Sequence, residues 1–200
     1  MSGVVKIGTE PAPGDVPRRA DAVRNREAVI KAAEEVFAER GIEAGVPDVA
    51  ERAGVGKGTV YRNFETKDEL VAAVLTARQQ RFTQQVEIAL EKDDAWLAFR
   101  DLLQETVRGK MKNGSFGFGL KAFEENEALA TERKCSHEHL ESLMKKAKKQ
   151  GAMRKDARPD DVSVLFGGIC RILDEREIDD PKVWRRHVDQ VVDAFRVQPA

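Results

Sequence analysis

The sequence predicts an all-α protein with a three-helix N-terminal domain and a larger helical C-terminal domain. Apolar residues recur at three- and four-residue spacing along most of the chain, and no segment alternates strictly enough for a β-strand. Glycines, prolines and capping residues fall between the apolar stretches, where helices are expected to begin and end. The expected division is a disordered arm over residues 1–20, a first domain over 21–66 and a second over 67–200.

The charges of the chain nearly balance. Lys and Arg total 34 against 35 Asp and Glu, and residues 1–78 alone carry 12 basic and 13 acidic side chains. No overall positive field draws such a chain to nucleic acid, so binding requires the basic side chains to gather on one face. The candidates for that face are Arg18, Arg19, Arg24, Lys57, Arg62 and Lys67.

Cysteine usage and apolar runs indicate the compartment. Cys135 and Cys170 are too few for a disulfide framework and fit a reducing environment. The N-terminal residues contain no apolar stretch of signal-peptide length, and no run approaches the roughly 20 apolar residues of a membrane span. We therefore expect a cytoplasmic protein that does not engage a membrane.

The first two segments differ sharply in pattern. Residues 1–20 mix Pro, Gly and charge without periodicity, which is typical of a disordered arm. A first helix is expected from about residue 22 to residue 40, because Ile30, Ala33 and Phe37 share one face and a glycine follows.

Residues 46–64 read as two short helices joined by a glycine turn. Pro47 suits the first turn of a helix, and Gly54 is able to end that helix in the left-handed conformation. Gly56 then opens a second helix over residues 57–63. In a helix-turn-helix of this layout the second helix enters the DNA major groove.

The exposed side of the second helix carries groups that can contact a duplex. Lys57 is able to donate to guanine O6 or N7, and Tyr61 offers a ring face and a hydroxyl. Thr59, Arg62 and Lys67 are within reach of phosphate oxygens. The same pattern is also compatible with two amphipathic surface helices whose charges are merely solvated.

A wider set of positions extends this pattern over about a quarter of the chain. It comprises Ile30, Ala33, Phe37, Gly41, Ala50, Ala53, Gly54, Val55, Gly58, Thr59, Val60, Tyr61, Phe64, Lys67 and Leu70. In this combination the segment from residue 24 to residue 74 resembles the DNA-binding domain of the TetR (tetracycline-repressor) family.

The resemblance implies roles for individual residues. It places Lys57, Gly58 and Tyr61 at base-reading positions. The positions expected to contact phosphate are Thr59, Arg62, Asn63 and Lys67, with Arg24 and Arg19 as further candidates from the first helix and the arm.

Three departures from the family pattern concern the helix ends. The segment between Gly41 and Ala50 is one residue shorter than the commoner spacing and lacks the usual Thr or Ser cap. Asn63 stands where many members carry His, and Gly56 replaces the frequent Ser that caps the second helix. The Gly56 change removes a side-chain acceptor for a terminal N–H.

The remainder of the chain is helical in pattern. Thr66-x-x-Glu69 is a capping box that predicts a long helix from Lys67 to about Leu90, long enough to link two domains. Later helices are expected over 94–112, after residue 119, along the basic stretch that ends in K-K-A-K-K, from Pro159, and from about Pro181 to Val197. The expected turns lie at Asn113–Ser115, Gln150–Gly151, Pro159 and Asp180–Pro181.

The last two helices are the predicted dimer interface, which would be a four-helix interface related by a two-fold axis. Gly167 and Gly168 would allow the backbones to approach closely there. The same apolar faces could instead close the core of the subunit itself. The interface residues are Val162, Leu165, Phe166, Ile169, Ile172, Val183, Trp184, Val188, Val191, Val192 and Phe195.

Large aromatic residues with flexible Met side chains suit the wall of an apolar ligand pocket. The predicted wall comprises Phe82, Trp96, Phe99, Leu103, Met111, Phe116, Phe118, Phe123, Met144 and Ile169. Each is also compatible with plain core packing, and Phe116 and Phe118 stand out because they lie in a glycine-rich loop. By resemblance, a ligand there would change the separation of the two DNA-reading domains and release DNA.

Other chemical motifs are not supported. The segment Gly56–Thr59 lacks the spacing of a phosphate-binding loop, and Cys135-x-His137-x-His139 lacks a fourth metal ligand. A redox switch through the two cysteines stays open, but no catalytic set stands out among three histidines. We expect no metal, no cofactor and no enzymatic activity.

The sequence therefore predicts a homodimeric, ligand-responsive transcription regulator, most simply a repressor. Its partners would be a pseudo-palindromic DNA operator and a small, largely apolar effector. One alternative is a ligand-binding or scaffold protein of the same fold that has lost operator binding. A second is a small helical enzyme, which would depend on His137, His139 or His187.

Overall fold

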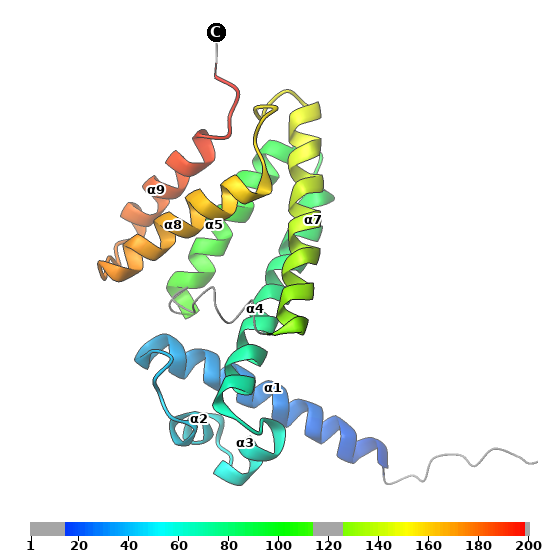
Figure 1. The fold of residues 1–200 in the computed structure, drawn as a ribbon, viewed down its shortest axis with the longest axis vertical. Helices are drawn as coiled ribbons and strands as arrows, with labels where there is room; N and C mark the ends of the chain where they lie inside the picture. Colours follow the sequence, from blue (N-terminus) through cyan, green and yellow to red (C-terminus); the bar gives the residue numbers. More distant parts are fainter. Residues whose placement is uncertain (1–14, 114–125, 199–200) are drawn as a thin grey trace, which may run out of the picture.

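The computed structural model describes residues 15–113 and 126–198 of the chain. Within these ranges the chain forms helices without strands, and an isolated β-bridge joins Met153 to Arg196. The predicted all-α class is confirmed. The helices are α1 (Asp15–Arg40), α2 (Val46–Ala53), α3 (Lys57–Asn63), α4 (Lys67–Leu90), α5 (Ala95–Asn113), α7 (Glu127–Lys149), α8 (Pro159–Glu175) and α9 (Pro181–Asp193) (Figure 1).

Two hydrophobic cores lie along the length of the molecule. The first joins α1, α2 and α3 to the N-terminal half of α4, and the second joins the C-terminal half of α4 to α5, α7, α8 and α9. Figure 1 shows the two groups at opposite ends, with α4 running from one to the other. The first core extends past the expected boundary at residue 67, because Leu70 and Val74 of α4 are fully buried in it.

Helix α7 fastens the second domain to the first. Its Leu129 is fully buried in the first core, although the rest of the helix packs along α4 and the second core. Two side-chain hydrogen bonds connect α4 to α7: Gln79 Nε2 donates to Ser136 Oγ at 2.5 Å, and Gln80 Nε2 donates to Glu132 Oε1 at 3.1 Å. A shift of α7 would therefore act on both cores.

Local caps set most helix ends where the sequence predicts them. Gly54 ends α2 with φ +67°, which a residue with a Cβ rarely adopts. Thr66 Oγ1 accepts from the Glu69 N–H at 3.1 Å and starts α4. The reciprocal bond differs from that of an ideal capping box, because Glu69 accepts from the N–H of Glu65 at 2.6 Å.

The expected start of the first helix is wrong. Helix α1 begins at Asp15 and so includes residues 15–20, which were expected in the disordered arm. Residues 21–28 are exposed, so packing does not explain the extension. Ala, Arg and Glu favour helix intrinsically, and Pro17 is tolerated in a first turn, so the packed part of α1 extends backwards without an apolar face.

The expected end of the last helix is also wrong. Helix α9 ends at Asp193 rather than near Val197, because the chain turns to pair with the segment after α7. The Arg154 N–H donates to the Phe195 carbonyl at 2.9 Å, and the Val197 N–H donates to the Ala152 carbonyl at 3.1 Å. Phe195 is thereby held in the second core.

Candidate nucleic-acid interface

Helix α3 is anchored by two apolar side chains and presents its other side to solvent. Val60 and Phe64 are 1% and 3% exposed and pack in the first core with α1 and α2. The turn before α3 is closed by the Val55 N–H, which donates to the Ala50 carbonyl at 3.0 Å. Since this anchoring fixes the rotation of α3 about its axis, it decides which side chains point outward.

The three predicted base-reading residues lie on that outward side. Lys57 and Gly58 are exposed at the start of α3, and the Tyr61 side chain is 51% exposed one turn later. Apart from the adjoining residues and the backbone of α3 itself, no atom lies within 4 Å of the position that a Cβ on Gly58 would occupy. The backbone at Gly58 is thus open to close approach by another molecule.

The three predicted phosphate-contacting residues on α3 bond to the helix itself. Arg62 Nε donates to the Gly58 carbonyl at 3.1 Å, and Arg62 Nη2 donates to Thr59 Oγ1 at 2.9 Å. Asn63 Nδ2 donates to the Thr59 carbonyl at 2.8 Å, one turn back along the same helix. Asn63 therefore has a structural function in addition to any contact with phosphate.

The other predicted phosphate contacts lie on neighbouring helices. Lys67 is half-buried at the first position of α4, and exposed Arg24 of α1 forms an ion pair with Asp21. Arg19 lies within α1, and its side chain is outside the described residues. Sequence reasoning missed Arg26, whose guanidinium carbon lies 4.7 Å from the centre of the Phe64 ring, beside the end of α3. The sequence signal for Arg26 was its position two residues after Arg24, a residue already proposed to contact phosphate.

Several carboxylates of the first domain are paired with arginines. Arg52 of α2 donates to Glu39 at 2.6 Å and to Glu35 at 3.3 Å, and both acceptors are on α1. The hydrogen bond from Arg52 holds the pKa of Glu39 below its ordinary value, and the same bond raises the pKa of Arg52. Arg40 likewise donates to Asp48 at 2.9 Å. Each of these pairs neutralises an arginine together with its acid, so the net charge of this domain stays balanced.

A second charged cluster lies at the junction between α1 and α4. Glu34 is 9% exposed and accepts from Arg78 Nε at 2.9 Å and from Arg81 Nη2 at 2.6 Å. Burial lowers the pKa of the Arg78 guanidinium, while Glu34 opposes this shift. Glu34 thus ties the first domain to the helix that continues into the second.

The described members of the predicted pocket wall belong to the packed second core. Phe99, Leu103 and Met144 are at most 1% exposed, and the Phe99 ring centre lies 6.0 Å from that of Trp96. The less buried members, Phe82 and Ile169, pack against this core from its edge. The side chains of Met111, Phe116, Phe118 and Phe123 lie outside the described residues.

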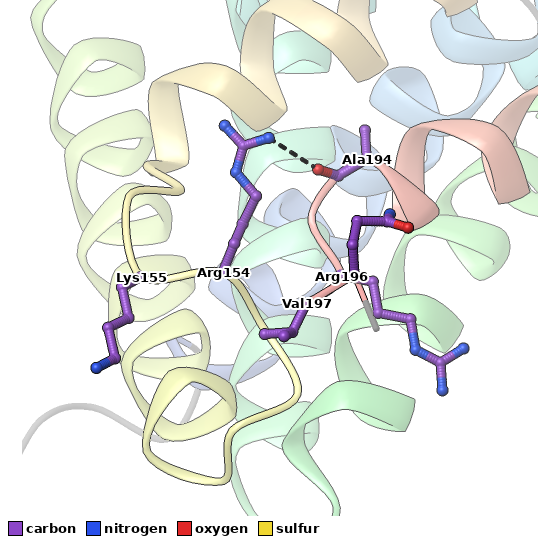
Figure 2. A pocket seen from close by; sticks show the side chains of 6 residues that line it. Arg154, Lys155, Ala194, Arg196 and Val197 are labelled. Atoms are coloured by element: carbon purple, nitrogen blue, oxygen red, sulfur yellow. Dashed lines mark hydrogen bonds between the residues drawn. The ribbon is translucent and has the colours of Figure 1, made fainter. Parts of the chain in front are cut away.

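A surface hollow lies beside one member of this predicted wall, because Arg196 lines the hollow and its guanidinium carbon is 5.8 Å from the centre of the Trp96 ring. Its volume is about 610 Å³, and it is lined by Arg154, Lys155, Ala194, Arg196, Val197 and Gln198. Figure 2 shows Arg154 reaching across to the carbonyl of Ala194, to which its Nη1 donates at 3.2 Å, while Lys155 points away. Arg154 is also paired with Asp156, so it is not a free cation.

Most of the predicted interface residues are instead buried within the subunit. Helix α8 contributes Val162 and Phe166, helix α9 contributes Trp184, Val188, Val191 and Val192, and the turn after α9 contributes Phe195; each is at most 8% exposed. In a single subunit these side chains belong to the second core. Apolar periodicity is the same for a core face and an interface face, so their assignment to a dimer interface stays a prediction.

A smaller apolar set remains on the surface of α8. Leu165 and Ile172 are 43% and 47% exposed, and Val164, which was not predicted, is 71% exposed. Ile169 and Val183 are half-buried. A Cβ added to Gly167 or Gly168 would meet no atom within 4 Å. The outer side of α8 is therefore apolar and open.

Within the described residues, the Cys135-x-His137-x-His139 motif does not form a metal site. His137 Nε2 lies 3.0 Å from Asp160 Oδ1, and Cys135 Sγ lies 4.0 Å from His139 Nδ1. Among residues 15–113 and 126–198, no group of three or more His, Cys, Asp and Glu side chains could hold a metal ion. No helix in the same part of the chain is both long and apolar enough to cross a membrane.

Comparison with known proteins identifies the first domain. Residues 29–74 match the family of bacterial regulatory proteins called the tetR family. A transcriptional repressor of Mycobacterium tuberculosis is 51% identical over 49 residues, which are 24% of this chain and 26% of that protein. The matched segment thus spans about a quarter of the length of such curated relatives.

Solved structures extend the likeness to both domains. A TetR transcription regulatory protein of Mycobacterium vanbaalenii is 29% identical with a TM-score of 0.63, covering 90% of this chain and 100% of that one. The TetR regulator SCO0520 of Streptomyces coelicolor is 27% identical with a TM-score of 0.64, covering 87% and 99%. With the helix-turn-helix of α2 and α3 and the helical second domain, these likenesses support a TetR-family transcriptional regulator.

Proposed function

We propose that this regulator binds a pseudo-palindromic operator as a homodimer, acts as a repressor, and is released from DNA by a small, largely apolar ligand. The outward side of α3 carries the proposal. Val60 and Phe64 hold the helix so that Lys57, Gly58 and Tyr61 face solvent together at the end of the molecule farthest from α9 (Figure 1). A second helix presented in this way suits entry into the major groove.

The roles of the three residues follow from their chemistry. The Lys57 ammonium would donate to acceptors on a base edge, most favourably guanine O6 and N7. Tyr61 would contact a base through its ring face or hydroxyl. Gly58 would let the backbone of α3 approach the groove, because it carries no side chain to hold the helix away.

Phosphate contacts would fix the orientation of α3 without reading sequence. Lys67 and Arg62 flank the C-terminal end of α3, and Arg24 and Arg26 lie on α1 nearby. Since Arg62 and Asn63 already bond within α3, their contribution requires those local bonds to be shared or exchanged. Lys67 and Arg26 are therefore the stronger phosphate candidates, and Thr59 is secondary, as is Arg24, which is paired with Asp21.

A homodimer is supported by the outer side of α8. Leu165 and Ile172 lie on it with Val164, and Gly168 between them leaves room for a second helix. We define Val164, Leu165, Gly168 and Ile172 as the α8 stripe. Covering it with a second copy would bury apolar surface that one subunit leaves in water. Two helix-turn-helix units would then address two operator half-sites.

Repression and ligand release are supported by relatives. The Mycobacterium tuberculosis protein is named a repressor. SmeT of Stenotrophomonas maltophilia, a repressor that shares the fold at 21% identity and a TM-score of 0.56, is known as a complex with triclosan. In this chain an apolar effector would lie against Phe82 and Ile169, at the edge of the second core, and act through α4 and α7.

Binding to selected duplex DNA tests the proposal. Sites are first selected from random duplexes by the wild-type protein, and affinity is then measured for Lys57→Ala and Tyr61→Ala at fixed salt. Loss of a good base contact costs about 1–3 kcal/mol, so we expect each variant to bind the selected site about 5- to 150-fold more weakly. The matched control is Lys149→Ala, which removes an exposed lysine from the far end of α7.

The outcome separates a regulator from a protein that has kept the fold without operator binding. Wild-type protein that selects no sequence, or Lys57→Ala and Tyr61→Ala variants that bind the selected site as tightly as the Lys149→Ala control, would contradict the proposal.

A further inference from the structure

The hollow of about 610 Å³ between the segment after α7 and the segment after α9 has both apolar and cationic sides. Ala194 and Val197 supply apolar surface, and Val197 is 47% exposed. Arg154, Lys155 and Arg196 supply positive charge, and no carboxylate is among the described residues that line the hollow. A space of this composition attracts a negatively charged group that carries an apolar part.

Bonds between the two segments hold the walls of the hollow in place. The Arg154 N–H donates to the Phe195 carbonyl at 2.9 Å, and Arg154 Nη1 donates to the Ala194 carbonyl at 3.2 Å. The same guanidinium is bonded to Asp156, which accepts from Arg154 Nε at 2.9 Å. Arg154 is therefore a fixed part of the wall, and the hollow is formed before any ligand arrives, which lowers the cost of binding.

The charges of Lys155 and Arg196 have no carboxylate partner within the subunit. Across residues 15–113 and 126–198, no ion pair involves either of them. The guanidinium carbon of Arg196 lies 5.8 Å from the centre of the Trp96 ring, and a contact of this kind leaves N–H donors available. These two residues are thus the cations that a bound anion would neutralise.

The two cations flank the apolar surface. Figure 2 shows Lys155 and Arg196 on opposite sides of Val197, so an anion beside Val197 would be approached from both. Lys155 points away in this view and would have to turn toward the ligand. Its side chain is exposed and flexible, so the turn costs mainly conformational entropy.

The surrounding sequence is biased toward positive charge. Residues 145–158 contain seven basic side chains and one acidic side chain, which is the Asp156 that Arg154 already pairs with. Some of the basic residues hold the segment in place. Lys146 Nζ donates to the Leu90 carbonyl at 3.2 Å, and Lys148 Nζ donates to the Ala157 carbonyl at 2.5 Å. Structural contacts thus explain part of this charge, and the surplus favours an anion at the hollow.

We propose that the hollow binds a small organic anion, in which a carboxylate or phosphate group is carried on an apolar body. The anionic group would accept hydrogen bonds from Lys155 and Arg196, and the apolar body would lie on Ala194 and Val197. Pockets for drug-sized ligands have volumes of about 300–1,000 Å³, so the hollow suits a ligand larger than inorganic phosphate. This site is separate from the effector site proposed at the edge of the second core, and it does not depend on DNA binding.

Titration calorimetry with four probes tests the chemistry. Octanoate and octyl phosphate carry the two head groups on the same chain, 1-octanol carries the chain without charge, and inorganic phosphate carries the charge without the chain. We expect the charged octyl probes to bind at least about tenfold more tightly than the other two, and the tighter of them identifies the head group. Binding of 1-octanol or inorganic phosphate as tight as that of both charged octyl probes would overturn the proposal.

Variants test whether the probes bind in the hollow. The double variant Lys155→Gln with Arg196→Gln removes both charges, and Val197→Glu places a carboxylate on the apolar surface. Each should weaken binding of the charged octyl probes at least about tenfold, while circular dichroism checks that the fold is kept. Lys155→Gln alone changes an exposed side chain, so it should weaken binding without affecting folding. The control variant carries Lys31→Gln and Lys134→Gln, which remove two positive charges from exposed positions of α1 and α7 and should leave binding unchanged.

Two results would contradict a site in the hollow. The first is that neither charged octyl probe binds the wild type. The second is that the hollow variants bind these probes as tightly as the control variant does, which would place the probes elsewhere, such as at the edge of the second core.

Discussion

In the first domain the helix-turn-helix motif separates exposed residues from buried ones. In the second domain the same apolar periodicity describes both core residues and residues on the surface. In α3 and at its end, Val60 and Phe64 face inward, whereas Lys57, Gly58 and Tyr61 face outward. In and after α8 and α9, most of the apolar residues that looked like an interface are instead core, and the exposed surface is a narrow α8 stripe with charges on α9. A motif with fixed spacing thus predicts exposure, but apolar periodicity alone does not.

The largest effect on stability is expected at Phe99, which was predicted to line the ligand pocket but is buried in the second core. Phe99 is fully buried and its ring centre lies 5.8 Å from that of Phe195. Phe99→Ala should lower the free energy of unfolding by about 3–5 kcal/mol in urea titrations, because it leaves a cavity in a packed core. The control Ile88→Ala, at a 59% exposed position of α4, should change it by less than about 0.5 kcal/mol. A small effect of Phe99→Ala would favour a preformed pocket.

Many helix boundaries are predictable because residues at or next to the helix ends determine them. Gly54, the Thr66 cap and Pro159 mark the ends of α2, α4 and α8 regardless of what those helices contact. The start of α1 and the end of α9 escape prediction for different reasons. The first is a propensity-driven extension without an apolar face, and the second depends on a pairing between residues 152–154 and 195–197.

The candidate sites divide in the same way. The outward side of α3 follows from a motif, so Lys57, Gly58 and Tyr61 are exposed as their proposed roles require. Two features depend on contacts between distant helices and have no local signal: the pairing of Glu34 with Arg78 and Arg81, and the burial of Trp184 and Val188.

The junction between the two domains offers a second test. Glu34→Ala removes the carboxylate that accepts from both Arg78 and Arg81 at the junction between α1 and α4. We expect a loss of about 1–3 kcal/mol in unfolding free energy. The control Glu27→Ala removes a glutamate from an exposed position of α1 and should have little effect. Equal stability of both variants would show that the cluster does not hold the domains together.

The α8 stripe predicts a smaller effect that appears in association rather than folding. Leu165→Glu places a charge on a 43% exposed position. Sedimentation should show a dimer dissociation constant raised at least tenfold, about 1.4 kcal/mol, with little change in secondary structure. An unchanged dissociation constant would indicate that another surface pairs the subunits.

The smallest effect on stability is expected for the exposed ion pair between Glu39 and Arg52. Because Arg52 depresses the pKa of Glu39 below its ordinary value of 4.5, the pair stabilises the fold above that pH. This contribution is lost as the pH falls through the lower pKa of the folded state. The difference in urea midpoint between wild type and Glu39→Gln should therefore be slight and constant near neutral pH, and should shrink below about pH 4.5. A difference that grows as the pH falls would contradict the pairing.

The central claim is that the outward side of α3 reads base pairs. The most direct measurement is the base preference of wild type and Lys57→Ala, obtained by sequencing duplexes that each selects from a random pool. The account predicts a two-fold symmetric motif for wild type, and loss of preference at one symmetric pair of positions for Lys57→Ala. The same motif with the same preference at every position in both proteins would contradict it.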